Sequence, residues 1–137
     1  MSANLDFEFN FIKGLLGKST RKRWRALFTS QNGRKRFLKK LYHDYMFDDK
    51  YTIELTPSNL MPDDIYDLLQ NYGAPDTCYI IANNVDMDTK TLNLRECLHY
   101  IQGNFSEGWI LCCVPGSLLY YIGEAPYNRF IVYKDTD

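Results

Sequence analysis

Three apolar runs near the C-terminus constrain the fold of this chain most strongly. Residues 109–114 (WILCCV), 118–122 (LLYYI) and 130–133 (FIVY) are rich in aliphatic and aromatic residues, and each run is too short for an ordinary helix. Pro115 and Gly116, between the first two runs, are the residues that a type II turn requires. Residues 123–128 contain Gly, Pro and Asn and connect the second run to the third. The sequence therefore predicts a three-stranded antiparallel meander.

A fourth strand is expected upstream of the meander. Residues 77–82 (TCYIIA) form a short apolar run typical of a strand buried on both faces. The following Asn93-Leu94-Arg95-Glu96 has the pattern of a capping box that begins a helix, which Gly103 would end. A strand, a helix and then the strand at 109–114 would allow a right-handed βαβ crossover. We expect a small, mostly antiparallel four-stranded sheet.

Helical spacing dominates the N-terminal part of the chain. Residues 4–16 combine strand-like alternation of phenylalanines with helical spacing of aliphatic residues, and we favour a short helix there. Ser19 or Thr20 is suited to cap a helix over residues 21–28. Ser30 is suited to cap the next helix, whose apolar stripe extends over residues 37–46.

A third helix is marked at both ends. The helical pattern before it breaks at Asp48-Asp49, a polar pair typical of a loop. Pro62 suits the first position of a helix, and Gly73 with Pro75 would end it. These helices and the sheet together predict an α+β fold, with N-terminal helices packed on the four-stranded sheet.

The 137 residues correspond to one domain, residues 1–137, in which a basic helical segment (1–47) precedes an acidic α+β body (48–137). A hydrophobic content of 45% with 24% charged residues is typical of a globular chain and argues against disorder. We find no apolar run that approaches the length of a membrane span, and no secretory signal pattern at the N-terminus. We therefore expect no membrane partner. The four cysteines lie inside apolar segments, so we expect reduced thiols and a cytoplasmic protein.

Positive charge is concentrated at the front of the chain. Residues 1–40 contain eleven Lys or Arg, and the acids there are Asp6 and Glu8; residues 41–137 contain five basic and fifteen acidic residues. The net charge of −1 therefore conceals two strongly opposed halves. Such asymmetry indicates an interaction surface.

The basic residues of the two predicted N-terminal helices are the candidate polyanion site. They are Lys18, Arg21, Lys22, Arg23, Arg25, Arg34, Lys35, Arg36, Lys39 and Lys40. Trp24, Phe28 and Phe37 lie among them and could act as stacking platforms for bases. Their helical spacing favours the alternative that they are core residues.

The candidate motifs for nucleotide and metal binding each lack a required residue. Residues 14–19 lack the first glycine of a phosphate-binding loop, and residues 84–95 lack the glycine and the glutamate of a calcium loop. A Cys–His pair could be assembled in space, but cysteines in strands are usually inert. The cysteines and histidines considered are Cys78, Cys97, Cys112, Cys113, His43 and His99. We expect no cofactor and no metal, and an enzyme is the less favoured class.

Tyrosines of the predicted meander leave two alternatives open. Tyr120, Tyr121, Tyr127 and Tyr133 would alternate between the faces of the sheet. They could form a contact patch on an open face, or helices could cover them.

The leading functional hypothesis is a non-enzymatic binding module that engages nucleic acid or another polyanion through the basic helices. The alternative is a protein–protein inhibitor or immunity-type module whose acidic body covers a basic partner such as a nuclease. The acidic residues concerned are Asp44, Asp48, Asp49, Glu54, Asp63, Asp64 and Asp67. In a third arrangement, the basic helices pack on the acidic body of the same chain or of a second copy, which would give a homodimer.

Overall fold

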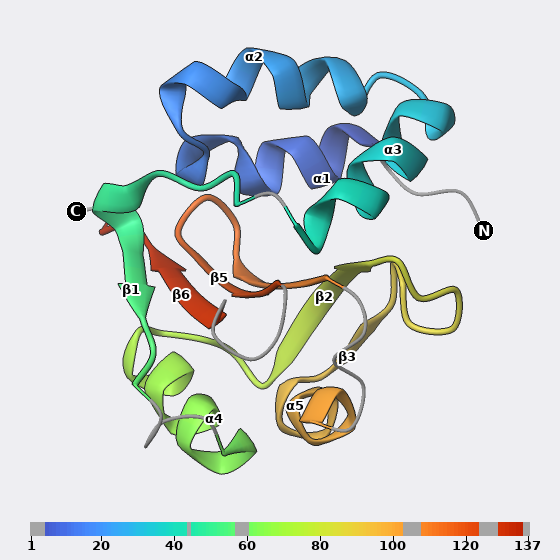
Figure 1. Cartoon of the computed structure of the whole chain (residues 1–137). Helices are drawn as coiled ribbons and strands as arrows, with labels where there is room; N and C mark the ends of the chain where they lie inside the picture. The colour runs from blue at the N-terminus through green and yellow to red at the C-terminus, as the bar shows by residue number, and fades with distance from the viewer. Residues whose placement is uncertain (1–4, 44, 57–60, 103–107, 124–128, 136–137) are drawn as a thin grey trace.

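The computed structural model describes residues 5–43, 45–56, 61–102, 108–123 and 129–135. Its elements are α1 (Leu5–Ile12), η1 (Lys13–Leu15), α2 (Lys18–Leu27), α3 (Gln31–Leu41), η2 (Asp49–Tyr51), β1 (Thr52–Glu54), α4 (Pro62–Asn71), β2 (Thr77–Ala82), β3 (Thr91–Asn93), α5 (Leu94–Gln102), β4 (Trp109–Val114), β5 (Leu118–Ile122) and β6 (Arg129–Tyr133). They form three layers: α1, α2 and α3 cover one face of the sheet, and α4 and α5 cover the other (Figure 1). The predicted α+β class is confirmed.

The predicted C-terminal meander is present. β4 pairs with β5 and β5 with β6, both antiparallel. Gly116 has a φ of 70°, and the N–H of Ser117 donates to the carbonyl of Val114 at 3.1 Å, which closes the turn between β4 and β5. A positive φ at this position is what glycine allows at little cost, so the turn prediction is confirmed.

The predicted number of strands and the predicted βαβ crossover were wrong. The sheet has six strands in the order β1-β6-β5-β4-β2-β3. β2 pairs antiparallel with β4, whereas a βαβ crossover would make them parallel. The reason is β3, which pairs antiparallel with β2 and so reverses the chain once before α5. The two missed strands, β1 and β3, have three residues each and are too short to show an alternating pattern.

The N-terminal helices follow the prediction except at the start of α2 and at the end of α3. The residue that precedes α2 is Gly17, which makes no side-chain cap, and the hydroxyl of Thr20 instead donates to the carbonyl of Gly17 at 3.0 Å. Ser30 caps α3 as predicted, accepting from the N–H of Gly33 at 3.0 Å. α3 ends at Leu41, five residues before the end of its predicted apolar stripe, and Met46 reaches the core from the segment after the helix.

The helices on the other face begin where the sequence indicated. Pro62 opens α4, and Gly73 with a φ of 99° follows its end. The side chain of Asn93 accepts from the N–H of Glu96 at 3.0 Å, so the predicted cap of α5 is present. Gly103, which was expected to end this helix, lies outside the described residues.

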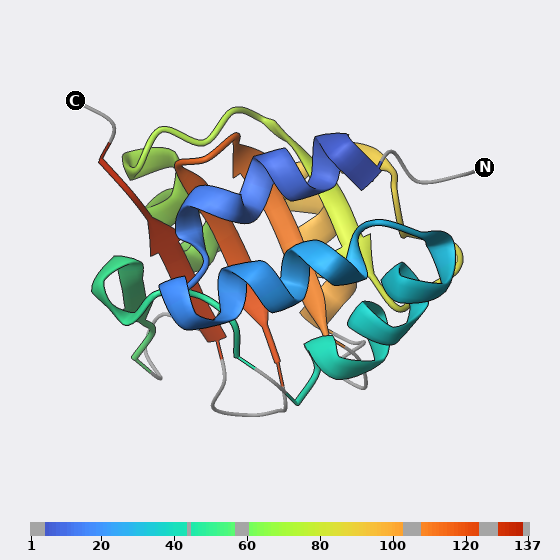
Figure 2. The ribbon, with the colours of Figure 1, turned by 90° about the horizontal axis from the view of Figure 1, so that it is seen from above.

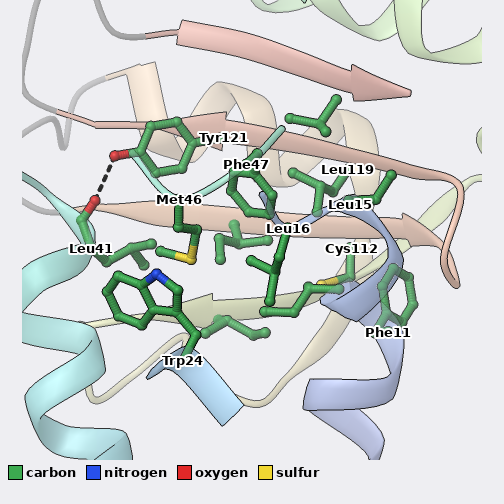
Figure 3. Packing of buried hydrophobic residues seen from close by; sticks show 14 of the residues in the cluster. Phe11, Leu15, Leu16, Trp24, Leu41, Met46, Phe47, Cys112, Leu119 and Tyr121 are labelled. Carbon is green, nitrogen blue, oxygen red and sulfur yellow. Dashed lines mark hydrogen bonds between the residues drawn. The ribbon is translucent and has the colours of Figure 1, made fainter. Parts of the chain in front are cut away.

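Each face of the sheet contributes to its own apolar core. The cluster under α1, α2 and α3 includes Trp24, Cys112 and Tyr121, and the hydroxyl of Tyr121 donates to the carbonyl of Leu41 at 2.6 Å (Figure 3). The opposite cluster includes Cys113 and Tyr120. Successive strand residues therefore face opposite cores, because side chains alternate across a sheet.

The tyrosine patch does not form from the described residues. Tyr120 and Tyr121 are each 1% exposed, because helices cover both faces. Tyr133 is half-buried and packs on Tyr72 with ring centroids 4.7 Å apart. Tyr127 lies outside the described residues. In the described part of the chain, no helix has the length and apolar character needed to cross a membrane.

Candidate polyanion-binding surface

Nine of the ten predicted site residues are exposed on one layer of the molecule. Figure 2 looks onto this layer and shows α2 lying between α1 and α3. The exposed cations, called the basic surface below, are Lys18, Arg21, Lys22, Arg23, Arg25, Lys35, Arg36, Lys39 and Lys40. Among the residues that the structure describes, none of these nine forms an ion pair with a carboxylate. They remain available to an external anion.

The sequence explains why these cations are outside. On α3, Phe37, Leu38 and Leu41 are buried, and the helical period places the exposed residues on the opposite side. Between Glu8 and Asp44 the sequence contains no Asp or Glu. The outer faces of α2 and α3 are therefore positive without an interspersed acid.

The basic surface brings like charges together. Four pairs of cations stand four residues apart on the same helix: Lys18 and Lys22, Arg21 and Arg25, Lys35 and Lys39, and Arg36 and Lys40. Like charges at this spacing destabilise a helix by about 0.2–0.5 kcal/mol per pair. A bound polyanion would remove this repulsion.

A groove between α1 and α2 extends the basic surface. It has a volume of about 890 Å³ and is lined by Leu5, Asp6, Phe9, Asn10, Lys13, Arg21, Lys22, Arg25, Phe28 and Thr29. Four of these side chains are cationic and one is a carboxylate. Lys13 was not among the predicted site residues, since its place beside α2 depends on how α1 packs. The groove could hold a negatively charged chain between the two helices.

Arg34 is the exception, and its inclusion in the site was wrong. Its side chain is 6% exposed and lies between two carboxylates. Nε and Nη2 donate to the two oxygens of Glu8 at 2.7 and 2.8 Å. Nη1 and Nη2 donate to the two oxygens of Asp88 at 2.6 and 2.8 Å. Four of the five N–H donors of the guanidinium are thus bound to carboxylates inside the protein.

Further hydrogen bonds complete this buried cluster. The hydroxyl of Tyr79 donates to Glu8 at 2.7 Å, and the N–H of Ala82 donates to Asp88 at 3.0 Å. Burial by itself lowers the pKa of Arg34, but the hydrogen bonds to Asp88 and Glu8 outweigh burial and the pKa is raised. Arg34 therefore stays charged and joins α1, α3 and the β2–β3 turn.

The aromatic residues between the cations are core residues. Trp24 and Phe37 are fully buried, and Phe28 is 4% exposed. Trp24 and Phe37 meet edge to face with centroids 5.1 Å apart. The hypothesis that these rings are stacking platforms was wrong, because a buried ring offers no face to a base.

Three of the cysteines, Cys78, Cys112 and Cys113, lie in surroundings that disfavour the thiolate. All four are buried and free of disulfides. Burial raises the pKa of Cys113 to about 12 and that of Cys112 well above its ordinary value. A hydrogen bond with Cys97, together with burial, raises the pKa of Cys78. Nucleophilic attack requires the thiolate, so burial makes the thiols of Cys78, Cys112 and Cys113 poor nucleophiles.

The other ionisable groups of the described residues include one exposed cluster on α4 and α5. In the described ranges, no group of three His, Cys, Asp or Glu residues could hold a metal ion. Asp63 accepts from His99 at 2.9 Å and from Arg95 at 3.1 Å, and these bonds lower its pKa. All three side chains are more than half exposed, as is usual for surface pairs.

Comparisons with known proteins give no information on function. Neither the family models, nor the curated proteins, nor the solved structures gave a match to this chain.

Proposed function

We propose that this chain is a non-enzymatic binding module that engages nucleic acid or another polyanion through the basic surface. One observation carries the proposal: nine cations are exposed on α2 and α3, and no carboxylate of the described chain is paired with any of them. Exposed helices ordinarily mix charges of both signs. A surface of one sign attracts a partner of the other and accelerates its association.

The partner's charge has to be repetitive to match this surface. The cations occupy several turns of two neighbouring helices, so a single small anion would meet only a few of them. A chain of phosphates or sulfates can contact many at once and releases the counterions condensed on it. This release makes the affinity depend steeply on salt concentration.

The proposal is tested by fluorescence anisotropy with a fluorescein-labelled 20-base-pair DNA duplex, titrated at several NaCl concentrations. Each phosphate contact contributes about −0.9 to the slope of log K against log[NaCl]. Engagement of at least about four cations therefore predicts a slope near −4 or steeper. No measurable binding of the duplex or of heparin at low salt would overturn the proposal.

Paired variants locate the interaction. The double variant Arg21→Gln, Arg25→Gln should weaken binding and reduce the steepness of the salt dependence by about 2, since two phosphate contacts are lost. Lys50→Gln, Lys90→Gln removes the same charge from exposed positions outside α2 and α3 and is the matched control. Equal losses for the two double variants would show that only overall charge matters.

A second candidate is the inhibitor or immunity-type module, favoured by three of its seven predicted acids, Asp63, Asp64 and Asp67, which lie on α4 in the opposite layer; Asp44 lies outside the described residues. Asp64 and Asp67 are exposed on α4, and Asp63 is engaged with Arg95 and His99. A basic protein would be attracted to this layer, and charge complementarity would mainly raise the rate of association. Co-purification of the native protein with a basic nuclease would support this candidate, provided that the double variant Asp64→Asn, Asp67→Asn no longer co-purifies with it.

A further inference from the structure

We propose that the polyanion is double-stranded DNA and that α3 enters its major groove. This inference rests on the proposed function and narrows it to one ligand. It follows from three observations: the absence of an exposed aromatic platform on α2 and α3, the composition of the exposed face of α3, and the way α3 is fixed to the rest of the molecule.

The burial of the aromatic side chains argues against a single-stranded ligand. Proteins that bind single strands stack the bases on exposed aromatic rings. Trp24 and Phe37 lie in the two basic helices and Phe28 directly follows α2, but all three belong to the core. The outer faces of α2 and α3 therefore offer charge without an exposed ring, which suits a duplex whose bases are already stacked on one another.

The exposed face of α3 has the residue types that contact base edges. Asn32 and Arg36 are exposed one turn apart, and Lys39 continues the same stripe. Asparagine pairs with the edge of adenine and arginine with that of guanine in the major groove. Lys35 and Lys40 flank the stripe and can reach phosphates.

The dimensions of α3 fit B-form DNA better than RNA. Its eleven residues span about 16 Å, and a helix with its side chains is about 10–12 Å wide. The major groove of B-DNA, about 12 Å wide, admits such a helix. The major groove of double-stranded RNA is too deep and narrow for side chains to contact its bases.

α3 is held firmly on both sides. Arg34 joins its inner face to Glu8 of α1 and to Asp88 of the β2–β3 turn. Gly33 packs so closely on α2 that an added Cβ would lie 2.3 Å from the carbonyl oxygen of Leu27. α2 therefore keeps a fixed place beside α3, where its cations can contact the phosphates that border the groove.

Competition measurements test the ligand class. A labelled DNA duplex is first bound to the full chain. Four unlabelled competitors are then added at equal phosphate or sulfate concentration: duplex DNA, duplex RNA of the same sequence, single-stranded DNA and heparin. We expect duplex DNA to compete at least roughly tenfold better than duplex RNA or single strands. Equal competition by all four would overturn the inference and leave the proposed function standing, whereas absence of binding to any of them would overturn both.

A selection from a duplex with randomised base pairs tests the placement of α3. Wild type should enrich a preferred base at a position that Asn32→Ala loses, with a loss of discrimination of roughly tenfold, because one good base contact is removed. The salt dependence should stay unchanged, because no charge is removed. Asn71→Ala, at an exposed position of α4, is the control and should keep the preference. The inference fails if wild type enriches no base, or if both variants behave alike.

Discussion

Arg34 differs from the cations around it because two carboxylates enclose its guanidinium. The neighbouring Lys35 and Arg36 are exposed on the same helix. Helical spacing alone distinguishes the buried side of α3 from the exposed side, and it places Arg34 next to the apolar residues. The partners of Arg34 are not visible in the sequence, because Glu8 and Asp88 are 26 and 54 positions away.

Removal of Arg34 should be strongly destabilising. Arg34→Met leaves the buried Glu8 and the partly buried Asp88 without a cation, and the loss of one partner from a buried ionic cluster costs about 3–5 kcal/mol. Arg36→Met changes an exposed arginine on the same helix and should alter the free energy of unfolding by less than about 0.5 kcal/mol. Urea denaturation followed by circular dichroism measures both. Similar values for the two variants would contradict the buried cluster.

Buried thiols predict a loss of stability at alkaline pH. The pKa of Cys113 rises from 9.0 to about 12 on folding, and those of Cys78 and Cys112 also rise. Above pH 9 the unfolded chain releases thiol protons that the folded chain keeps, so the free energy of unfolding falls as pH increases. Each thiol contributes at most about 1.4 kcal/mol per pH unit.

Denaturation in a reducing buffer between pH 7 and pH 11 measures this effect. Cys113→Ala should show a shallower decline above pH 9 than wild type, because one of the shifted groups is removed. Parallel declines for the two proteins would show that the thiol of Cys113 ionises equally in both states.

The helices and the longer strands were predictable because each carries its own local signal. β2 was predicted with its observed bounds, and Ser30, Pro62 and Asn93 marked helix starts correctly. β1 and β3 were not predicted, because three residues are too few to show the two-residue alternation of a strand. Their pairing also depends on strands distant in sequence. The direction of β4 relative to β2 was missed for the same reason: it depends on β3.

The contact between α2 and α3 is sensitive to one glycine. Gly33→Ala improves the intrinsic helix propensity, but its Cβ would meet the backbone of Leu27 at 2.3 Å. The helices would have to move apart, so we expect a loss of about 1–3 kcal/mol in thermal or urea unfolding. Asn32→Ala, the exposed neighbouring position, should leave stability within about 0.5 kcal/mol. Stabilisation by Gly33→Ala would contradict the close approach.

Within the described residues, the two helical layers of the molecule differ in charge, although Asp6 lies in the groove between α1 and α2 and Arg95 is exposed on α5. The layer of α1, α2 and α3 carries the basic surface, and the layer of α4 and α5 carries exposed carboxylates including Asp64, Asp67 and Glu96. The sequence predicted the charge separation along the chain. Whether the basic helices would be neutralised by the body could not be predicted, since that depends on which face of the sheet they cover.

Anions should stabilise the folded protein as a whole. On the proposed function, heparin would bind the basic surface of the native protein and reduce the repulsion within the like-charge pairs on α2 and α3, so it should raise the melting temperature. A shift of several degrees at a hundredfold excess over Kd is expected, and it should disappear in 1 M NaCl. Neutral dextran of similar length is the control. An equal shift with dextran would exclude a charge effect.

The most direct test of the basic surface is lysine footprinting by mass spectrometry, with and without heparin at low salt. Brief acetylation labels exposed amines in proportion to their accessibility. We predict that heparin protects Lys18, Lys22, Lys35, Lys39 and Lys40 and leaves Lys50 and Lys90 labelled as before. Unchanged labelling of the first group while heparin is bound, or protection confined to Lys50 and Lys90, would contradict the account.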